Sequence, residues 1–111
     1  LREQGILLVG SGSMTHNLHE LRREDGPTAP YVSEFCDWVH DTLMQGQLPA
    51  MLDYRQQAPH AARAHPTDEH FLTIYFALGA AGWGGSNSPR PRYITRDVQF
   101  QTLAMDAFSL H

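Results

Sequence analysis

The sequence has few of the features that mark a membrane, nucleic-acid-binding or secreted protein. No apolar run among its 111 residues approaches the roughly 20 that a membrane-spanning helix needs. Lysine and arginine number 8 against 12 acidic residues, and the net charge of −4 predicts a partner that is neither nucleic acid nor an anionic membrane. The single cysteine, Cys36, excludes an internal disulfide and favours a reducing compartment such as the cytoplasm.

The composition is that of a globular domain, with 41% hydrophobic and 18% charged residues. Residues 1–5 resemble the last turn of a helix closed by a glycine, and an apolar stretch follows at once. A helix that ends so early, with a strand directly after it, suggests an element further upstream. We therefore predict that residues 1–111 are the carboxyl-terminal part of a single larger domain, without its amino-terminal part.

Hydrophobic spacing predicts a mixed α/β fold in which a mixed sheet packs with helices. Residues 5–11 have the pattern of a buried central strand, and 29–45 that of an amphipathic helix capped by Thr28 and ended near Gly46. A second, well-buried helix is predicted from a Thr67 N-cap to Gly79. The remaining predicted elements are short helices in 17–25 and 48–54, a helical turn or loop over 59–66, a loop over 82–91, and strands over 93–95 and 103–110.

The stretch 5–17 places a histidine where α/β proteins carry their sites, in the loop after a strand. Its Gly/Ser turn is not a dinucleotide fingerprint, because Thr15 stands where G-x-G-x-x-G needs glycine. It also lacks the Lys of a phosphate-binding loop and the spacing of a serine nucleophile elbow. The turn therefore indicates a close approach of the backbone to a neighbour, and His16 is the candidate residue.

A second histidine pattern follows Pro66. With Thr67 as N-cap, His70 is the third residue of the predicted helix, where the dipole disfavours a protonated imidazole. A neutral imidazole can bind a metal or act as a general base. A histidine that is merely hydrogen-bonded at a helix start fits the same pattern, and spacing alone does not tell whether His70 meets His16.

The other chemical residues receive weaker predictions. His65 is expected at the surface, behind the site or against a substrate, and Ser13 is a further candidate substrate contact. An H-x-x-H pair of His16 and His19 is disfavoured, because nothing else in that segment suggests a metal site. Cys36 lies on the apolar face of its helix and is predicted to be an unreactive core thiol.

Three segments together resemble a known family. Gly10-Ser11-Gly12-Ser13-Met14-Thr15-His16-Asn17-Leu18, then Leu52-Asp53-Tyr54-Arg55, then His65-Pro66-Thr67-Asp68-Glu69-His70-Phe71-Leu72 resemble the class III extradiol ring-cleavage dioxygenases. The DOPA 4,5-dioxygenase-like branch is the most similar. The likeness extends over most of the chain and matches only the carboxyl-terminal part of the family.

The resemblance implies a non-haem metal enzyme that opens a catechol ring, such as that of DOPA, with O₂. It implies iron(II) for turnover, or zinc(II), and a small aromatic substrate. His16 and His70 would each be a metal ligand or an acid/base contact, and the division between them stays open. The amino-terminal histidine motifs of the family are not in this sequence. Two alternatives therefore remain, a zinc-dependent hydrolase and a non-catalytic fragment or binding module with an incomplete metal site.

Overall fold

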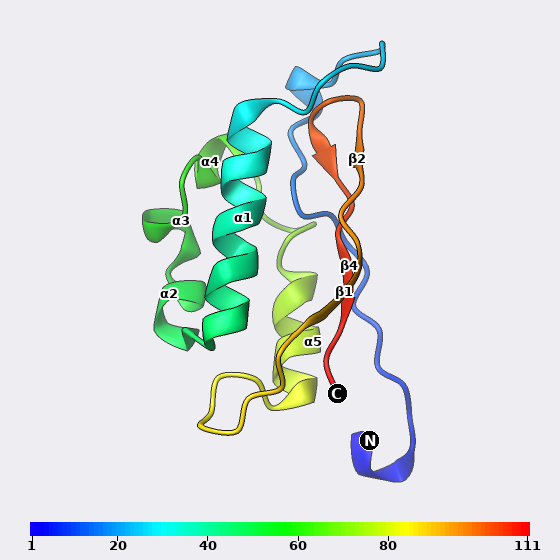
Figure 1. The fold of residues 1–111 in the computed structure, drawn as a ribbon, viewed down its shortest axis with the longest axis vertical. Helices are drawn as coiled ribbons and strands as arrows, with labels where there is room; N and C mark the ends of the chain where they lie inside the picture. Colours follow the sequence, from blue (N-terminus) through cyan, green and yellow to red (C-terminus); the bar gives the residue numbers. More distant parts are fainter.

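The computed structural model describes residues 1–111 as an elongated α/β unit measuring 44 × 27 × 21 Å. Helices gather on one side, and thin β-ribbons run along the other (Figure 1). The helices are α1 (Pro30–Gln45), α2 (Leu48–Leu52), α3 (Tyr54–Gln57), α4 (Ala61–Ala64) and α5 (Thr73–Ala81), with 3₁₀ turns η1 (Arg2–Gln4) and η2 (Leu18–Glu20). The strands are β1 (Arg92–Thr95), β2 (Val98–Gln99), β3 (Leu103–Ala104) and β4 (Ala107–Ser109). None of the helices is long and apolar enough to span a bilayer.

Helix α1 is the central support of the fold, and its predicted span is confirmed. Phe35, Val39 and Leu43 recur every four residues on one face and are completely buried. Gly46 ends the helix in the left-handed conformation, at φ 67°. The predicted Thr28 cap is wrong, because Ala29 occupies the N-cap without a side-chain bond and Pro30 begins the helix.

Helices α2, α3 and α4 follow α1 back along its flank (Figure 1). Their buried residues Met51, Tyr54, Ala61 and Ala64 join those of α1 in one hydrophobic cluster. The predicted helical segments 48–54 and 59–66 are therefore confirmed in outline. The predicted helix over 17–25 is reduced to the single turn η2.

Helix α5 begins five residues later than predicted. Leu72 occupies its N-cap position, and the Thr67 hydroxyl instead donates to the Glu69 carboxylate. Residues 68–72 form turns, closed by the Phe71 amide donating to the Asp68 carbonyl. The helix buries Ile74 and Leu78 but leaves Phe76 exposed, so the predicted all-round burial is also wrong.

The strands form two separate antiparallel pairs, β1 with β4 and β2 with β3. The predicted strand at 93–95 is confirmed, whereas the predicted strand over 103–110 is broken at residues 105–106. Strand β2 was not predicted, because two residues are too few to show alternation. The mixed α/β class itself is confirmed, whereas the single mixed sheet of the prediction is replaced by these two antiparallel pairs.

Residues 5–11 do not form the predicted central strand. Residues 7–12 make no backbone–backbone hydrogen bond, so no strand can be assigned. Leu7 is 85% exposed and Val9 70% exposed. The segment lies extended beside the β-ribbon (Figure 1), and the turn before it is closed by Gly5 at φ 73°, as predicted.

Candidate functional site

The structure brings His16 and His70 together. Their rings stack with centroids 3.8 Å apart and planes inclined by 26°. Two histidines 54 positions apart in the chain therefore lie in contact, which their spacing alone could not predict. His16 is half-buried, and the His70 side chain is 47% exposed, so the pair is open to solvent on one side.

His70 reaches this position from a turn and not from a helix. It precedes α5 by three residues, so the predicted role of the helix dipole in keeping it neutral is withdrawn. Its carbonyl accepts a 2.9 Å hydrogen bond from the Ser13 amide. A Cβ on Gly12 would lie 2.1 Å from the same carbonyl oxygen, so glycine is required where the two segments meet.

The loop that carries His16 is held from two sides. On one side, the His16 amide donates to the Ala64 carbonyl over 2.8 Å. On the other, the buried Thr15 hydroxyl donates to the Thr102 carbonyl and accepts from the Ala104 amide, each over 2.8 Å. The loop is thus fixed by hydrogen bonds that do not belong to a helix or a sheet. No sequence pattern marks a threonine that bonds to a distant backbone, so this role of Thr15 is visible only in the fold.

His65 is completely buried, and its ring Nε2 lies 2.6 Å from the Met14 carbonyl oxygen. Burial is the main reason that the pKa of this imidazole falls from 6.5 to about 4, while the contact with the Met14 carbonyl acts in the opposite direction. The predicted surface exposure is wrong. The buried ring has no exposed surface that could contact a substrate, in contrast to the substrate contact predicted for His65.

Ser13 lies beside the histidine pair, half-buried, and its hydroxyl donates to the Thr15 carbonyl over 2.6 Å. It also lines an open cavity of about 620 Å³, together with His70, α5 and the chain's last residues. The cavity is mostly apolar in its lining, as binding sites for small aromatic molecules are. Ser13 therefore remains available for the substrate contact predicted for it.

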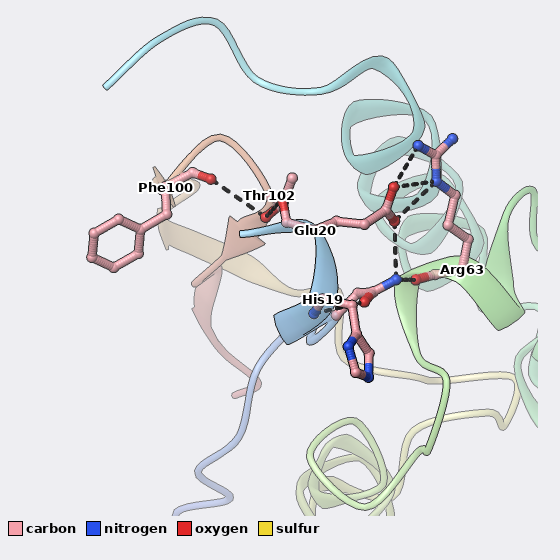
Figure 2. A network of polar contacts seen from close by, with 6 residues as sticks. His19, Glu20, Arg63, Phe100 and Thr102 are labelled. Carbon is pink, nitrogen blue, oxygen red and sulfur yellow. Dashed lines mark hydrogen bonds and ion pairs between the residues drawn. The ribbon is translucent and has the colours of Figure 1, made fainter. Parts of the chain in front are cut away.

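Asn17 is a site-supporting residue that the sequence analysis missed. Its side-chain amide donates to the Arg63 carbonyl over 2.8 Å and to the Glu20 carboxylate over 2.9 Å. The same carboxylate accepts from the Arg63 guanidinium, with a shortest distance of 2.7 Å (Figure 2). Asn17 and Glu20 have the spacing of a capping box around η2, and this signal could have identified Asn17.

The metal-binding capacity of these residues is incomplete. No group of three or more histidine, cysteine or acidic residues is close enough to hold an ion. Zinc and non-haem iron both accept imidazole nitrogen, so the donor type of His16 and His70 fits. Catalytic zinc sites and facial-triad iron sites use three protein ligands, and the pair supplies two. The Glu69 carboxylate, 3.9 Å from His70 Nε2, is the acidic side chain beside the pair.

Three of the other histidines, His19, His40 and His60, and the cysteine do not join this site, whereas His111 lines the cavity beside His70. The ring of His19 points away from the polar network around Glu20 (Figure 2), and His60 contacts Glu34 at the surface. His40 contacts Asp41 and the ring of Tyr93. Cys36 is buried in the core, and burial raises the pKa of its thiol to about 12, as expected of an unreactive cysteine.

Comparison with known proteins identifies the family. Residues 1–102 match the family described as the catalytic LigB subunit of aromatic ring-opening dioxygenase. A protein of Portulaca grandiflora named 4,5-DOPA dioxygenase extradiol is 35% identical over 74% of this chain. A protein of the same name from Mirabilis jalapa is 32% identical over 86% of this chain.

A solved structure agrees with these matches. The crystal structure of an uncharacterized protein of Escherichia coli K12 superposes on 97% of this chain with a TM-score of 0.77 and 25% identity. The chain covers 44% of that structure and about a third of the two plant proteins, 31% and 34%. Both the match over residues 1–102 and the paired histidine segments lead to one conclusion: the chain belongs to the LigB family of aromatic ring-opening dioxygenases.

Proposed function

We propose that this chain carries half of the active site of an extradiol dioxygenase, which opens the ring of a catechol-type, DOPA-like aromatic with O₂. The observation that carries the proposal is the stacked pair of His16 and His70 inside a LigB-family chain. We place residues 1–111 in the carboxyl-terminal part of one catalytic domain, whose amino-terminal part would supply the remaining ligands. The coverage of about a third of the DOPA dioxygenases supports this arrangement.

His16 and His70 are the residues that would hold iron(II), or zinc(II), in the complete site. The bound metal would supply open positions at which a catechol and O₂ can bind next to each other. The residues of this chain would do the rest. Either imidazole of the pair could instead accept a catechol proton and later return it, which would leave the other to bind the metal. Ser13 and the apolar cavity beside His70 would hold the aromatic ring.

The direct test is turnover by the full-length protein. After anaerobic loading with iron(II), we expect O₂ uptake and a ring-opened product from catechols. His16→Ala and His70→Ala should each lower kcat by about 10²-fold or more, since each removes a ligand or a proton-transfer group. His19→Ala is the matched control and should keep full activity, because this exposed histidine lies outside the pair. Absence of both O₂ uptake and ring-opened product would refute the proposal.

A second candidate is favoured by the incomplete ligand set, namely a non-catalytic binding module with a partial metal site. Metal analysis separates the two. Stoichiometric iron or zinc in the full-length protein supports the enzyme, and weak, sub-stoichiometric metal supports the binding module. Metal-dependent hydrolysis without O₂ consumption would instead indicate a zinc hydrolase. A cytoplasmic location is proposed with the enzyme and is supported by the single, reduced Cys36.

A further inference from the structure

Two segments are joined by three consecutive hydrogen bonds next to the histidine pair. The end of α4, residues 63–65, lies against the loop 14–17. Asn17 donates its side-chain amide to the Arg63 carbonyl, and His16 donates its backbone amide to the Ala64 carbonyl, both over 2.8 Å. The third bond joins His65 Nε2 to the Met14 carbonyl over 2.6 Å. Of residues 63–65, Arg63 and Ala64 accept through their backbone carbonyls, and only His65 takes part through its side chain.

The chemistry of this bond defines the state of His65. A carbonyl oxygen only accepts, so Nε2 must carry the hydrogen. Nδ1 is buried and has no partner, and protonating it would place an unpaired charge in the core. His65 is therefore a neutral imidazole with its hydrogen on Nε2. Such a ring offers the loop one donor, in one fixed direction.

His65 also contacts the segment that carries the second histidine of the pair. Its ring centroid lies 4.8 Å from that of Phe71, the residue directly after His70. Phe35, from α1, packs on the ring at 5.5 Å, so the imidazole cannot turn freely. One buried side chain thus touches both the loop of His16 and the turn of His70.

We propose that His65 is a positioning residue of the site, which holds the Met14 carbonyl and the Phe71 ring so that His16 stacks on His70. The inference rests on the proposed function only for its effect on turnover. The loop keeps a second anchor in Thr15, whose hydroxyl bonds to Thr102 and Ala104 on the opposite side. Loss of the His65 donor should therefore shift the loop without unfolding it.

The first test needs no substitution. Long-range ¹H–¹⁵N correlation spectra of the histidine-labelled chain report which ring nitrogen carries hydrogen. We expect His65 with its hydrogen on Nε2 at neutral pH, and a nuclear Overhauser effect between the rings of His16 and His70. A hydrogen on Nδ1 alone would overturn the proposal, because the Met14 carbonyl would then lack its donor.

The second test compares His65→Gln, whose amide keeps a donor near the position of Nε2, with His65→Leu, which keeps the volume but has no donor. Zinc(II) alone is titrated into each protein. We expect His65→Leu to lose the contact between the two rings and to bind zinc(II) about 10- to 100-fold more weakly, as for other residues that orient a ligand. His65→Gln should stay within about threefold of the wild type.

Val39→Ala is the matched control, because it creates a small core defect in α1 without touching the site. It should lower the melting temperature but keep the ring contact and the zinc(II) affinity. An intact ring contact in His65→Leu, or equal losses in His65→Leu and Val39→Ala, would overturn the proposal. If His65→Leu does not fold, the spectrum of the wild type and the affinity of His65→Gln decide. Absent turnover with all these results as expected would refute the dioxygenase and leave the role of His65 standing.

Discussion

Acidification should destabilise the protein through His65, and the size of the effect follows from its burial. The pKa of this ring is about 4 in the folded chain against 6.5 for an ordinary histidine. The unfolded chain therefore takes up a proton near pH 6.5, whereas the folded chain does not until about pH 4. The contribution of the neutral ring is complete above pH 6.5 and is lost as the pH falls towards 4.

The two pKa values of His65 give the size of the change in the free energy of unfolding. A shift of one pKa unit corresponds to about 1.36 kcal/mol, so full loss would be roughly 3 kcal/mol. Between pH 7 and pH 5, proton linkage gives a loss of roughly 2 kcal/mol in the free energy of unfolding. That is a substantial part of the stability of a domain of this size, roughly 6–17 kcal/mol.

Urea unfolding, followed by circular dichroism at both pH values and constant ionic strength, measures this loss. His65→Gln keeps the hydrogen bond and cannot titrate, so the other histidines affect both proteins equally. We expect the wild type to lose roughly 2 kcal/mol more than His65→Gln between pH 7 and pH 5. Equal pH dependence in the two proteins would show that His65 is not the buried neutral ring described here.

Three further substitutions or reactions test the packing around the site. Gly12→Ala places a Cβ against the His70 carbonyl and should cost about 1–3 kcal/mol in urea unfolding, whereas Gly79→Ala, with open space inside α5, should stabilise by about 0.5–1 kcal/mol. Equal effects of the two alanines would contradict the close approach. Thr15→Val should cost about 1–3 kcal/mol by leaving the Ala104 amide without its acceptor, and Thr15→Ser should recover most of it. Cys36 should react with a thiol reagent only at the rate of unfolding, and rapid modification of the native protein would disprove its burial.

The elements that the sequence predicts well are those with a local cause. Helix α1 carries its own apolar stripe, a proline at the start and a glycine at the end, and its span was predicted to within one residue. Strand β1 was likewise predicted from three residues. The start of α5 was not, because Thr67 has the residue type of a cap but its hydroxyl bonds to Glu69. A threonine at this position can cap a helix or bond to a neighbouring side chain, and the sequence is the same in both cases.

The candidate site also contains some features with a local cause in the sequence and others without one. The Gly/Ser turn and the His70 segment could be found from residue types and spacing, and the resemblance joined them. The stacking of the two rings, the bond of the buried His65 to Met14 and the bonds of Thr15 join residues 51 to 89 positions apart. Such contacts leave no local pattern. In the exposed segment 7–12 the local pattern is present but the distant contact is not. Its apolar residues predict a paired strand, and no other part of this chain pairs with it.

The hydrogen bonds around the histidine pair determine how the site responds to substitutions. Neither His16 nor His70 belongs to a helix or strand, so backbone ladders do not set the geometry of the site. It is set by isolated backbone bonds, such as that from the His16 amide to the Ala64 carbonyl, and by side-chain bonds from Thr15, Asn17 and His65 to carbonyl groups far away in the chain. Each such bond is worth about 1 kcal/mol, little against the stability of the whole domain. Yet a displacement of about 1 Å at a reacting group can cost 10²-fold in rate. Substitutions at these three positions should therefore reduce function well before they reduce folding.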